Sequence, residues 1–257
     1  PRRGPGGPMV RGACARLVGA SLVIKTAMIL AAGKGTRMRA SAEDPPKPLT
    51  QIGNQSLLFR MLGRLEAAGL ETIVVNVHHK AQAIEAALES YSGPANITIS
   101  DERDALLETG GGVKRALSYL APTSETAGFL VANGDVLWRE ETAVLDGFLA
   151  RFDPQKMDAL LLLAPRNQAT GYDGTGDYTM SADGQLRRKT EREADYIFAG
   201  VQILSPSLFE TLPEGAFSLN QAYDLAQNNG RLYGYVLNGL WMHVGTPEGR
   251  AEAEAAL

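Results

Sequence analysis

Residues 25–38 have the sequence KTAMILAAGKGTRM, in which a short apolar run is followed at once by a glycine-rich segment. The run in residues 25–31 has the length and the aliphatic content of a buried strand. In an open α/β sheet, ligands bind at the carboxyl ends of the strands. Small residues at such an end let backbone N–H groups approach a phosphate closely. The stretch therefore predicts a parallel sheet whose first strand ends in a phosphate-binding loop.

Strand-like and helical segments follow along the whole chain, and they alternate most regularly in its first half. The predicted strands are residues 71–77, 96–100, 128–132, 159–163, 196–204 and 231–237. The predicted helices are residues 58–69, 80–89, 113–120, 141–151, 219–227 and 247–257. This alternation is typical of βαβ units and a parallel sheet. After residue 135 the pattern loosens, and residues 178–188 read as a hairpin that turns on Asp183 and Gly184. We predict an α/β fold with a Rossmann-like, mixed but mainly parallel central sheet, flanked by helices and joined to a smaller antiparallel subregion.

The composition excludes several classes of protein. With 257 residues, 44% hydrophobic and 21% charged, the chain is ordinary for a folded globular protein, so disorder and coiled coil are disfavoured. Its net charge of −4, without a stripe of Lys or Arg, predicts no nucleic-acid or membrane partner. The one cysteine, Cys14, excludes an intramolecular disulfide and a cysteine-based zinc cluster. We predict an extension over residues 1–24 and one domain over residues 25–257.

The glycine-rich segment must be distinguished from two better-known phosphate loops. It lacks the first glycine of a Walker loop, and Met38 stands where a dinucleotide fingerprint has its third glycine. Residues 44–48 (DPPKP) follow, and the prolines around Lys47 fix the backbone that carries its ammonium group. Arg37 offers a planar fork for a second phosphate. We predict Arg37 and Lys47 as catalytic cations that stabilise a triphosphate losing pyrophosphate.

Together, AAGKGTRM in residues 31–38 and PKPL in residues 46–49 resemble the signature of the sugar-1-phosphate nucleotidyltransferases. The resemblance extends from about Lys25 to the C-terminus. It implies transfer of a nucleotidyl group from a nucleoside triphosphate to a sugar 1-phosphate. The ETGGG form of residues 108–112 is similar to that of the N-acetylmuramate-1-phosphate uridylyltransferase branch, which implies UTP as donor and a role in peptidoglycan recycling.

The resemblance also implies a set of nucleotide-binding residues. These are Ala31, Ala32, Gly33, Gly35 and Thr36 in the first loop, Glu108, Thr109 and Gly110 in the second, and Asn133. The second loop precedes the helix predicted at residues 113–120. Its glycines have no Cβ atom, so the loop backbone could approach a nucleobase closely.

Two residues are predicted to hold Mg²⁺. Asp135 follows the fourth strand, and a carboxylate oxygen is a ligand that Mg²⁺ prefers. His243 stands in the segment WMHVGTPE, which resembles a family segment with an aspartate at this position. Imidazole is a softer ligand than Mg²⁺ usually takes, so His243 either binds the metal, orients its water, or bonds a phosphate. A structural histidine is the remaining alternative.

Acceptor-side residues are predicted in the second half of the chain. Gly176, Asp177 and Gly200 resemble positions that flank the sugar in the family, and Lys189 lies between them. The residue that meets the anionic groups of the acceptor could equally be Arg187, Arg188 or Arg192, and the sequence does not distinguish them from Lys189.

The predicted reaction is the attack of a sugar-1-phosphate oxygen on the α-phosphorus of UTP. The alternatives are a glucose-, mannose- or phosphocholine-type transferase that uses another nucleotide, and a non-catalytic nucleotide-binding regulator. The substrates imply a cytoplasmic enzyme, and we expect a monomer or a homodimer.

We expect that deletion of residues 1–23 leaves the activity intact, because the core strand and every predicted site residue lie after them. Expression of residues 24–257 and an assay of pyrophosphate release test this. Loss of soluble, active protein would contradict it.

Overall fold

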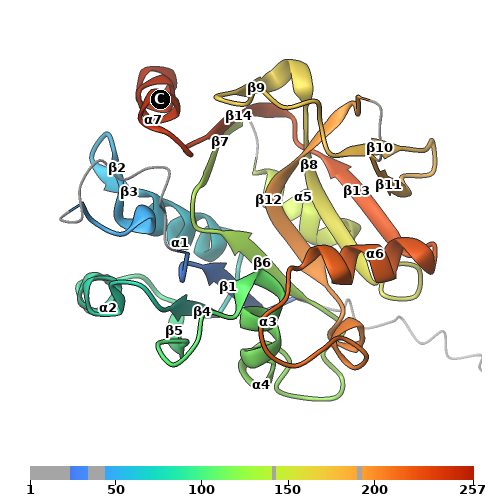
Figure 1. The fold of residues 1–257 in the computed structure, drawn as a ribbon, viewed down its shortest axis with the longest axis horizontal. Helices are drawn as coiled ribbons and strands as arrows, with labels where there is room; N and C mark the ends of the chain where they lie inside the picture. The colour runs from blue at the N-terminus through green and yellow to red at the C-terminus, as the bar shows by residue number, and fades with distance from the viewer. Residues whose placement is uncertain (1–23, 34–43, 141–142, 190–192) are drawn as a thin grey trace, which may run out of the picture.

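The computed structural model describes residues 24–33, 44–140, 143–189 and 193–257 (Figure 1). The strands are β1 (Thr26–Leu30), β2 (Gln51–Ile52), β3 (Gln55–Ser56), β4 (Thr72–Val77), β5 (Asn96–Asp101), β6 (Phe129–Asn133), β7 (Val136–Glu140), β8 (Ala159–Pro165), β9 (Ala169–Thr170), β10 (Tyr178–Met180), β11 (Leu186–Arg188), β12 (Tyr196–Leu204), β13 (Leu232–Val236) and β14 (Gly239–His243). The α-helices are α1 (Leu57–Ala67), α2 (Ala81–Glu89), α3 (Glu108–Arg115), α4 (Leu117–Leu120), α5 (Val144–Arg151), α6 (Asn220–Asn228) and α7 (Pro247–Ala256). Single 3₁₀ turns are η1 (Lys47–Leu49), η2 (Arg166–Gln168) and η3 (Pro206–Phe209). Within these ranges no helix is both long and apolar enough to span a bilayer.

Strands from both halves of the chain join in one nine-stranded sheet. In it, β5, β4, β1 and β6 are neighbours in that order and all run parallel. Antiparallel to β6 lies β12, which also pairs with β8, and β13 runs parallel beside β8. The hairpin of β10 and β11 pairs with the start of β12, where Tyr178 lies opposite Tyr196. The predicted fold class is confirmed, including the antiparallel character of the second half.

Helices cover both faces of this sheet. On one face, α1, α2 and α5 bury their apolar sides against the strands. The predicted spacing in α1 holds, since Leu58, Met61, Leu62 and Leu65 all face this core. On the other face, a second core lies under α3, α4 and α6. Figure 1 shows α6 in front of the strands and α5 behind them. The carboxyl ends of the parallel strands are therefore left open between the helical layers.

A second, three-stranded sheet was not predicted. It has the order β7-β14-β9 and packs with α7 against a small core of its own. Residues 133–135 (NGD) read as the end of a strand, but β7 begins directly after them at Val136. The β14 partner lies about a hundred residues later, so the pairing depends on a long-range contact that local patterns do not reveal.

The predicted glycine loop before a helix at residues 113–120 is wrong. The three glycines lie inside α3, which begins at Glu108, and a break at Ala116 separates α3 from α4. Close packing explains their presence in a helix. A Cβ at Gly111 would lie 2.1 Å from the carbonyl oxygen of Gly215, and one at Gly110 would lie 2.3 Å from the ring of Phe217. Tertiary contact here overrides the low helix propensity of glycine.

Gly111→Ala should lower the free energy of unfolding by about 1–3 kcal/mol, because the added methyl group collides with backbone. Gly63→Ala in α1 is the matched control. A Cβ at Gly63 meets nothing within 4 Å, so this change should stabilise the protein by about 0.4–1 kcal/mol. Urea denaturation of both variants tests the pair, and stabilisation by both would contradict the packing at α3.

Candidate active site

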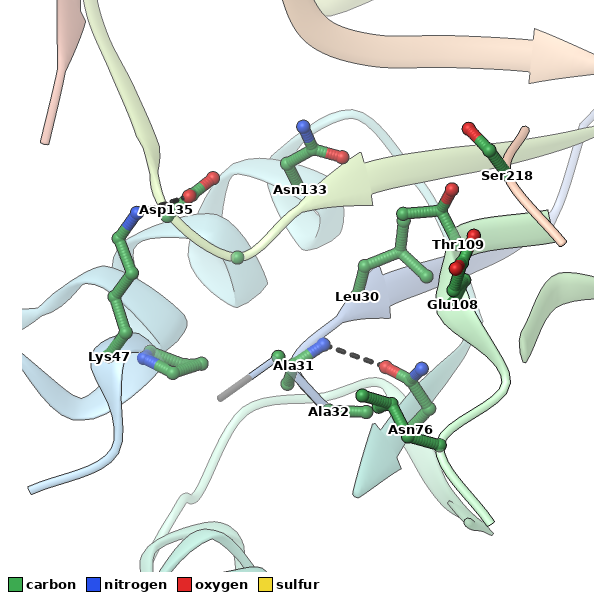
Figure 2. Close-up of a pocket in the computed structure, with 14 residues that line it drawn as sticks. Leu30, Ala31, Ala32, Lys47, Asn76, Glu108, Thr109, Asn133, Asp135 and Ser218 are labelled. Carbon is green, nitrogen blue, oxygen red and sulfur yellow. Dashed lines mark hydrogen bonds and ion pairs between the residues drawn. The ribbon is translucent and has the colours of Figure 1, made fainter. Parts of the chain in front are cut away.

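A cavity of about 500 Å³ opens where β1, β4 and β6 end (Figure 2). It is lined by Leu30, Ala31, Ala32, Gly33, Lys47, Pro48, Asn76, Leu106, Glu108, Thr109, Asn133, Gly134, Asp135 and Ser218. Its volume lies in the usual range of small-molecule sites. The strand ends thus bring together residues that are up to about 190 positions apart in the sequence, at the edge where ligands of open α/β sheets bind.

The turn between β6 and β7 lies directly against the end of β1. The N–H of Gly134 donates to the carbonyl of Leu30 at 3.0 Å. A Cβ at Gly134 would lie 2.8 Å from that same oxygen and 3.5 Å from the ring of Pro48. Glycine at this position therefore allows the close approach that brings Asp135 over the cavity.

Lys47 and Asp135 form an ion pair on this wall. Their Nζ and Oδ2 atoms are 2.5 Å apart, and the side chains are 12% and 32% exposed (Figure 2). Lys47 begins η1, between Pro46 and Pro48, and the N–H of Leu49 donates to the carbonyl of Pro46. The prolines thus hold the lysine backbone as predicted. Because the pair is mostly shielded from water, the attraction between its two charges is weakly screened.

The opposite wall comes from the start of α3 and the segment before α6. Glu108 has a φ of 58°, which is unusual for a residue with a side chain, and it faces the cavity beside Thr109 (Figure 2). The hydroxyl of Thr109 accepts a hydrogen bond from the N–H of Leu219 at 2.9 Å, which places Ser218 at the rim. Gly110 is buried, does not line the cavity, and donates its N–H to the carbonyl of Phe217.

Asn76 forms part of the cavity wall, although the sequence analysis did not single it out. Its Oδ1 accepts from the N–H of Ala31 at 2.7 Å, and its Nδ2 donates to Oε1 of Glu102 at 2.7 Å. Glu102 is fully buried behind it, and this burial raises the pKa of the Glu102 carboxyl, while the hydrogen bond from Asn76 opposes the rise. The available signal was the one polar residue, Asn76, within the apolar run IVVNV of residues 73–77.

His243 lies beside the Asp135 segment, on a neighbouring strand. It pairs with Val136 in the β14–β7 ladder, and its ring makes an edge contact with Trp241 at 5.8 Å. A Cβ at Gly245 would lie 2.1 Å from Nε2 of His243, so the imidazole rests on the Gly245 backbone. His243 does not line the cavity. Across the described residues there is no cluster of three or more His, Cys, Asp or Glu side chains that could hold a metal.

Among the four predicted acceptor residues, Gly200 lies beside the cavity residue Asn133. It has a φ of 83°, and a Cβ there would lie 3.2 Å from Nδ2 of Asn133. Gly200 thus allows β12 to approach the end of β6. The absence of its side chain leaves Asn133 unobstructed on that side.

The other three flank the β10–β11 hairpin, where Asp177 bonds to the start of β12, and they do not line the cavity. The Asp177 carboxylate accepts from the N–H of Phe198 at 2.9 Å, and the Lys189 ammonium bonds the Thr175 hydroxyl. Gly176 has a φ of 85°, as its turn requires. Asp177 thus has a structural role that fixes β10 against β12.

In the first loop, Ala31, Ala32 and Gly33 line the cavity, and their role in nucleotide binding stays a prediction. Gly35, Thr36 and Arg37 lie outside the described residues. The structure therefore gives the position of one predicted catalytic cation, Lys47, and the other remains a prediction from the sequence.

Known proteins resemble this chain in sequence and in fold. The sequence profile described as the MobA-like NTP transferase domain matches residues 27–179. The N-acetylmuramate alpha-1-phosphate uridylyltransferase of Caulobacter vibrioides is 43% identical over 91% of this chain and 97% of its own length. The protein of that name from Neisseria meningitidis serogroup B is 34% identical over 89% of this chain and 96% of its own length. The crystal structure of HddC from Yersinia pseudotuberculosis complexed with GMP-PN superimposes with a TM-score of 0.73, at 24% identity, over 91% of this chain and 99% of that chain.

The raised pKa of Glu102 gives a testable pH dependence. Between its ordinary pKa of 4.5 and the higher value in the folded protein, the folded state holds more protons than the unfolded state. The free energy of unfolding should therefore fall as pH rises through this interval. Glu102→Gln keeps the acceptor for Asn76 and removes the titration, so the variant should gain stability relative to wild type from pH 4 to pH 8. Denaturation at several pH values measures this, and an unchanged or opposite difference would contradict it.

Proposed function

Because the chain belongs to the MobA-like NTP transferase domain family, we propose that it transfers the uridylyl group of UTP to N-acetylmuramate α-1-phosphate and releases pyrophosphate. One observation carries the assignment of a nucleotidyl-transfer site: the Lys47–Asp135 pair lies on the wall of a cavity at the carboxyl edge of the parallel strands. The acceptor and the base are supported by the two relatives that the chain covers almost completely, both of which carry the name of this reaction.

The proposed reaction needs no general base. An oxygen of the acceptor phosphate, ionised at neutral pH, attacks the α-phosphorus of UTP. The new bond joins that oxygen to the α-phosphorus, and the bond from the α-phosphorus to the bridging oxygen breaks. Its electron pair leaves with pyrophosphate. Lys47 stabilises the negative charge that grows on the phosphate oxygens, and the shaped cavity holds the two substrates in line.

Asp135 fits a role as a ligand of Mg²⁺. Mg²⁺ is usually held by one or two carboxylates together with substrate phosphates, and it keeps several waters. The cavity wall offers the Asp135 carboxylate in that manner, rather than a cage of protein ligands. When bound, the ion would neutralise charge on the phosphate oxygens. His243, which pairs with Val136 next to Asp135, is proposed to bind the ion, to orient its water or to bond a phosphate.

On the α3 side, Glu108 and Thr109 are proposed to face the base and ribose, and Asn133 the ribose or the acceptor. Lys189, Gly176 and Asp177 are proposed to form the rim of the acceptor site, next to Gly200. A place in peptidoglycan recycling, and the cytoplasm as location, follow from these substrates and are part of the proposal. Another nucleotide or another sugar is not favoured, because the two relatives at 43% and 34% identity are uridylyltransferases by name.

Lys47→Ala and Asp135→Ala should each lower kcat by roughly 10²–10³-fold, if each loss resembles removal of one preorganised stabilising group. The assay is pyrophosphate release from UTP with N-acetylmuramate 1-phosphate, with and without EDTA, and chelation should abolish turnover. Lys25→Ala is the matched control, since Lys25 forms an ion pair of the same length with Glu71 but is exposed and absent from the cavity lining.

Activity of Lys47→Ala or Asp135→Ala within twofold of wild type would overturn their assigned roles. A panel of the four ribonucleoside triphosphates against several sugar 1-phosphates tests the substrates directly. Turnover with glucose or mannose 1-phosphate but not with N-acetylmuramate 1-phosphate would overturn the acceptor.

A further inference from the structure

Three neighbouring strand ends are joined by side-chain hydrogen bonds in addition to the backbone ladder, in which the N–H of Glu102 donates to the carbonyl of Val77 at 2.8 Å. β1, β4 and β5 are adjacent in the sheet. Ala31 and Glu102 directly follow β1 and β5, and Val77 is the last residue of β4. Asn76, near the end of β4, bonds to Ala31 on one side and to Glu102 on the other. These two hydrogen bonds, each 2.7 Å long and buried, continue the links between the strands into the region that forms the cavity.

Ala31 and Glu102 together fix the orientation of the Asn76 amide. The N–H of Ala31 can only donate, so Oδ1 of Asn76 must face it and Nδ2 must face the other way. A carboxylate is the acceptor that Nδ2 then meets. Without Glu102, the buried Nδ2 would lose its acceptor, and the amide would be held only by its hydrogen bond from Ala31.

Glu102 also touches α3, which forms the opposite wall of the cavity. A Cβ at Gly112 would lie only 2.7 Å from Oε1 of Glu102, so the helix packs directly on the carboxylate. Glu108 and Thr109, at the start of that helix, line the cavity. Glu102 is therefore in contact with both walls, although it is itself fully buried and does not line the cavity.

We propose that Glu102 is a positioning residue for nucleotide binding, which sets the distance between the strand-end segment at Ala31 and the start of α3. The inference rests on the proposed function, since it takes UTP as the occupant of the cavity. A buried carboxylate is costly to keep, and an apolar residue could fill the same space at a lower cost. A role in holding two ligand-binding segments in register explains why a hydrogen-bond acceptor stands here in place of an apolar residue.

The test compares Glu102→Ala with Glu102→Gln. Glu102→Ala should lower kcat/KM for UTP by roughly 10–100-fold, the effect of misplacing binding groups by about 1 Å. Most of this should appear in KM for UTP, with KM for the sugar 1-phosphate within twofold. Glu102→Gln keeps the acceptor oxygen for Asn76 and should restore kcat/KM to within threefold of wild type.

A double-mutant cycle with Asn76→Ala tests the connection itself. If Glu102 acts through Asn76, the effects of Asn76→Ala and Glu102→Ala on kcat/KM should not add, because each single change already breaks the same path. Asn76→Ala also covers the case in which Glu102→Ala does not fold, since it removes the link to Ala31 and leaves Glu102 in place.

Glu66→Ala is the control for a merely structural role. Glu66 also accepts from a side chain and a backbone N–H, namely the Tyr91 hydroxyl at 2.8 Å and the N–H of Ala95 at 3.1 Å, and it does not line the cavity. This variant should lower Tm without changing KM for UTP. If Glu102→Ala behaves in the same way, or if Glu102→Gln fails to restore the KM, the positioning role is wrong.

Calorimetric titration with UTP alone tests the positioning role of Glu102 separately from the proposed reaction. A wild-type protein that binds UTP but releases no pyrophosphate with N-acetylmuramate 1-phosphate would overturn the proposed reaction. Weaker UTP binding by Glu102→Ala, restored by Glu102→Gln, would then still support the positioning role. Equal UTP affinity of wild type and Glu102→Ala would overturn it, whatever the acceptor.

Discussion

The site depends on how closely the backbones at the carboxyl edge of the sheet approach one another. A parallel ladder satisfies backbone groups only as far as the strands run, and beyond their ends the same groups need other partners. At the end of β1, the carbonyl of Leu30 receives the N–H of Gly134, and the N–H of Ala31 is bonded to the side chain of Asn76. These two contacts pull the β6–β7 turn and the β4 end against the first loop, and the cavity is the space they enclose.

Glycine makes these approaches possible at three separate points. Gly134 lies against Leu30, Gly112 lies against the Glu102 carboxylate, and Gly200 lies against Asn133. In each case a Cβ would lie within 3.2 Å of a polar atom of a neighbouring segment. Glycine loses more conformational freedom on folding than other residues, so each position lowers stability somewhat. In return, backbone and polar groups from distant segments approach within hydrogen-bonding range.

Local patterns were sufficient to predict the layers of the fold. Strand length, the spacing of Leu58, Met61 and Leu62, and the turn at Asp183 all follow from short-range preferences that tertiary contacts did not override. The glycine-containing start of α3 was missed because its helical state depends on packing against residues about a hundred positions away. The pairing of β7 with β14 was missed for the same reason.

The site residues also differ in whether a local sequence signal points to them. Lys47 and Asp135 were predicted as site residues because prolines and a strand-end NGD are local signals, and the family resemblance supplied the chemistry that joins them. The structure brings the two side chains together. Asn76 and Ser218 carried little or no such signal, since a single polar residue in a strand or before a helix is common. What places them at the cavity is the fold itself.

The Lys47–Asp135 pair also bears on the form in which an anion can bind here. At 2.5 Å the two charges neutralise each other, so a bare triphosphate would compete with Asp135 for the ammonium group and leave that carboxylate next to added negative charge. An anion accompanied by a divalent cation avoids this conflict, because the carboxylate then faces a cation while the ammonium faces phosphate. The pair is therefore better suited to the metal-complexed nucleotide of the proposed function than to a free one.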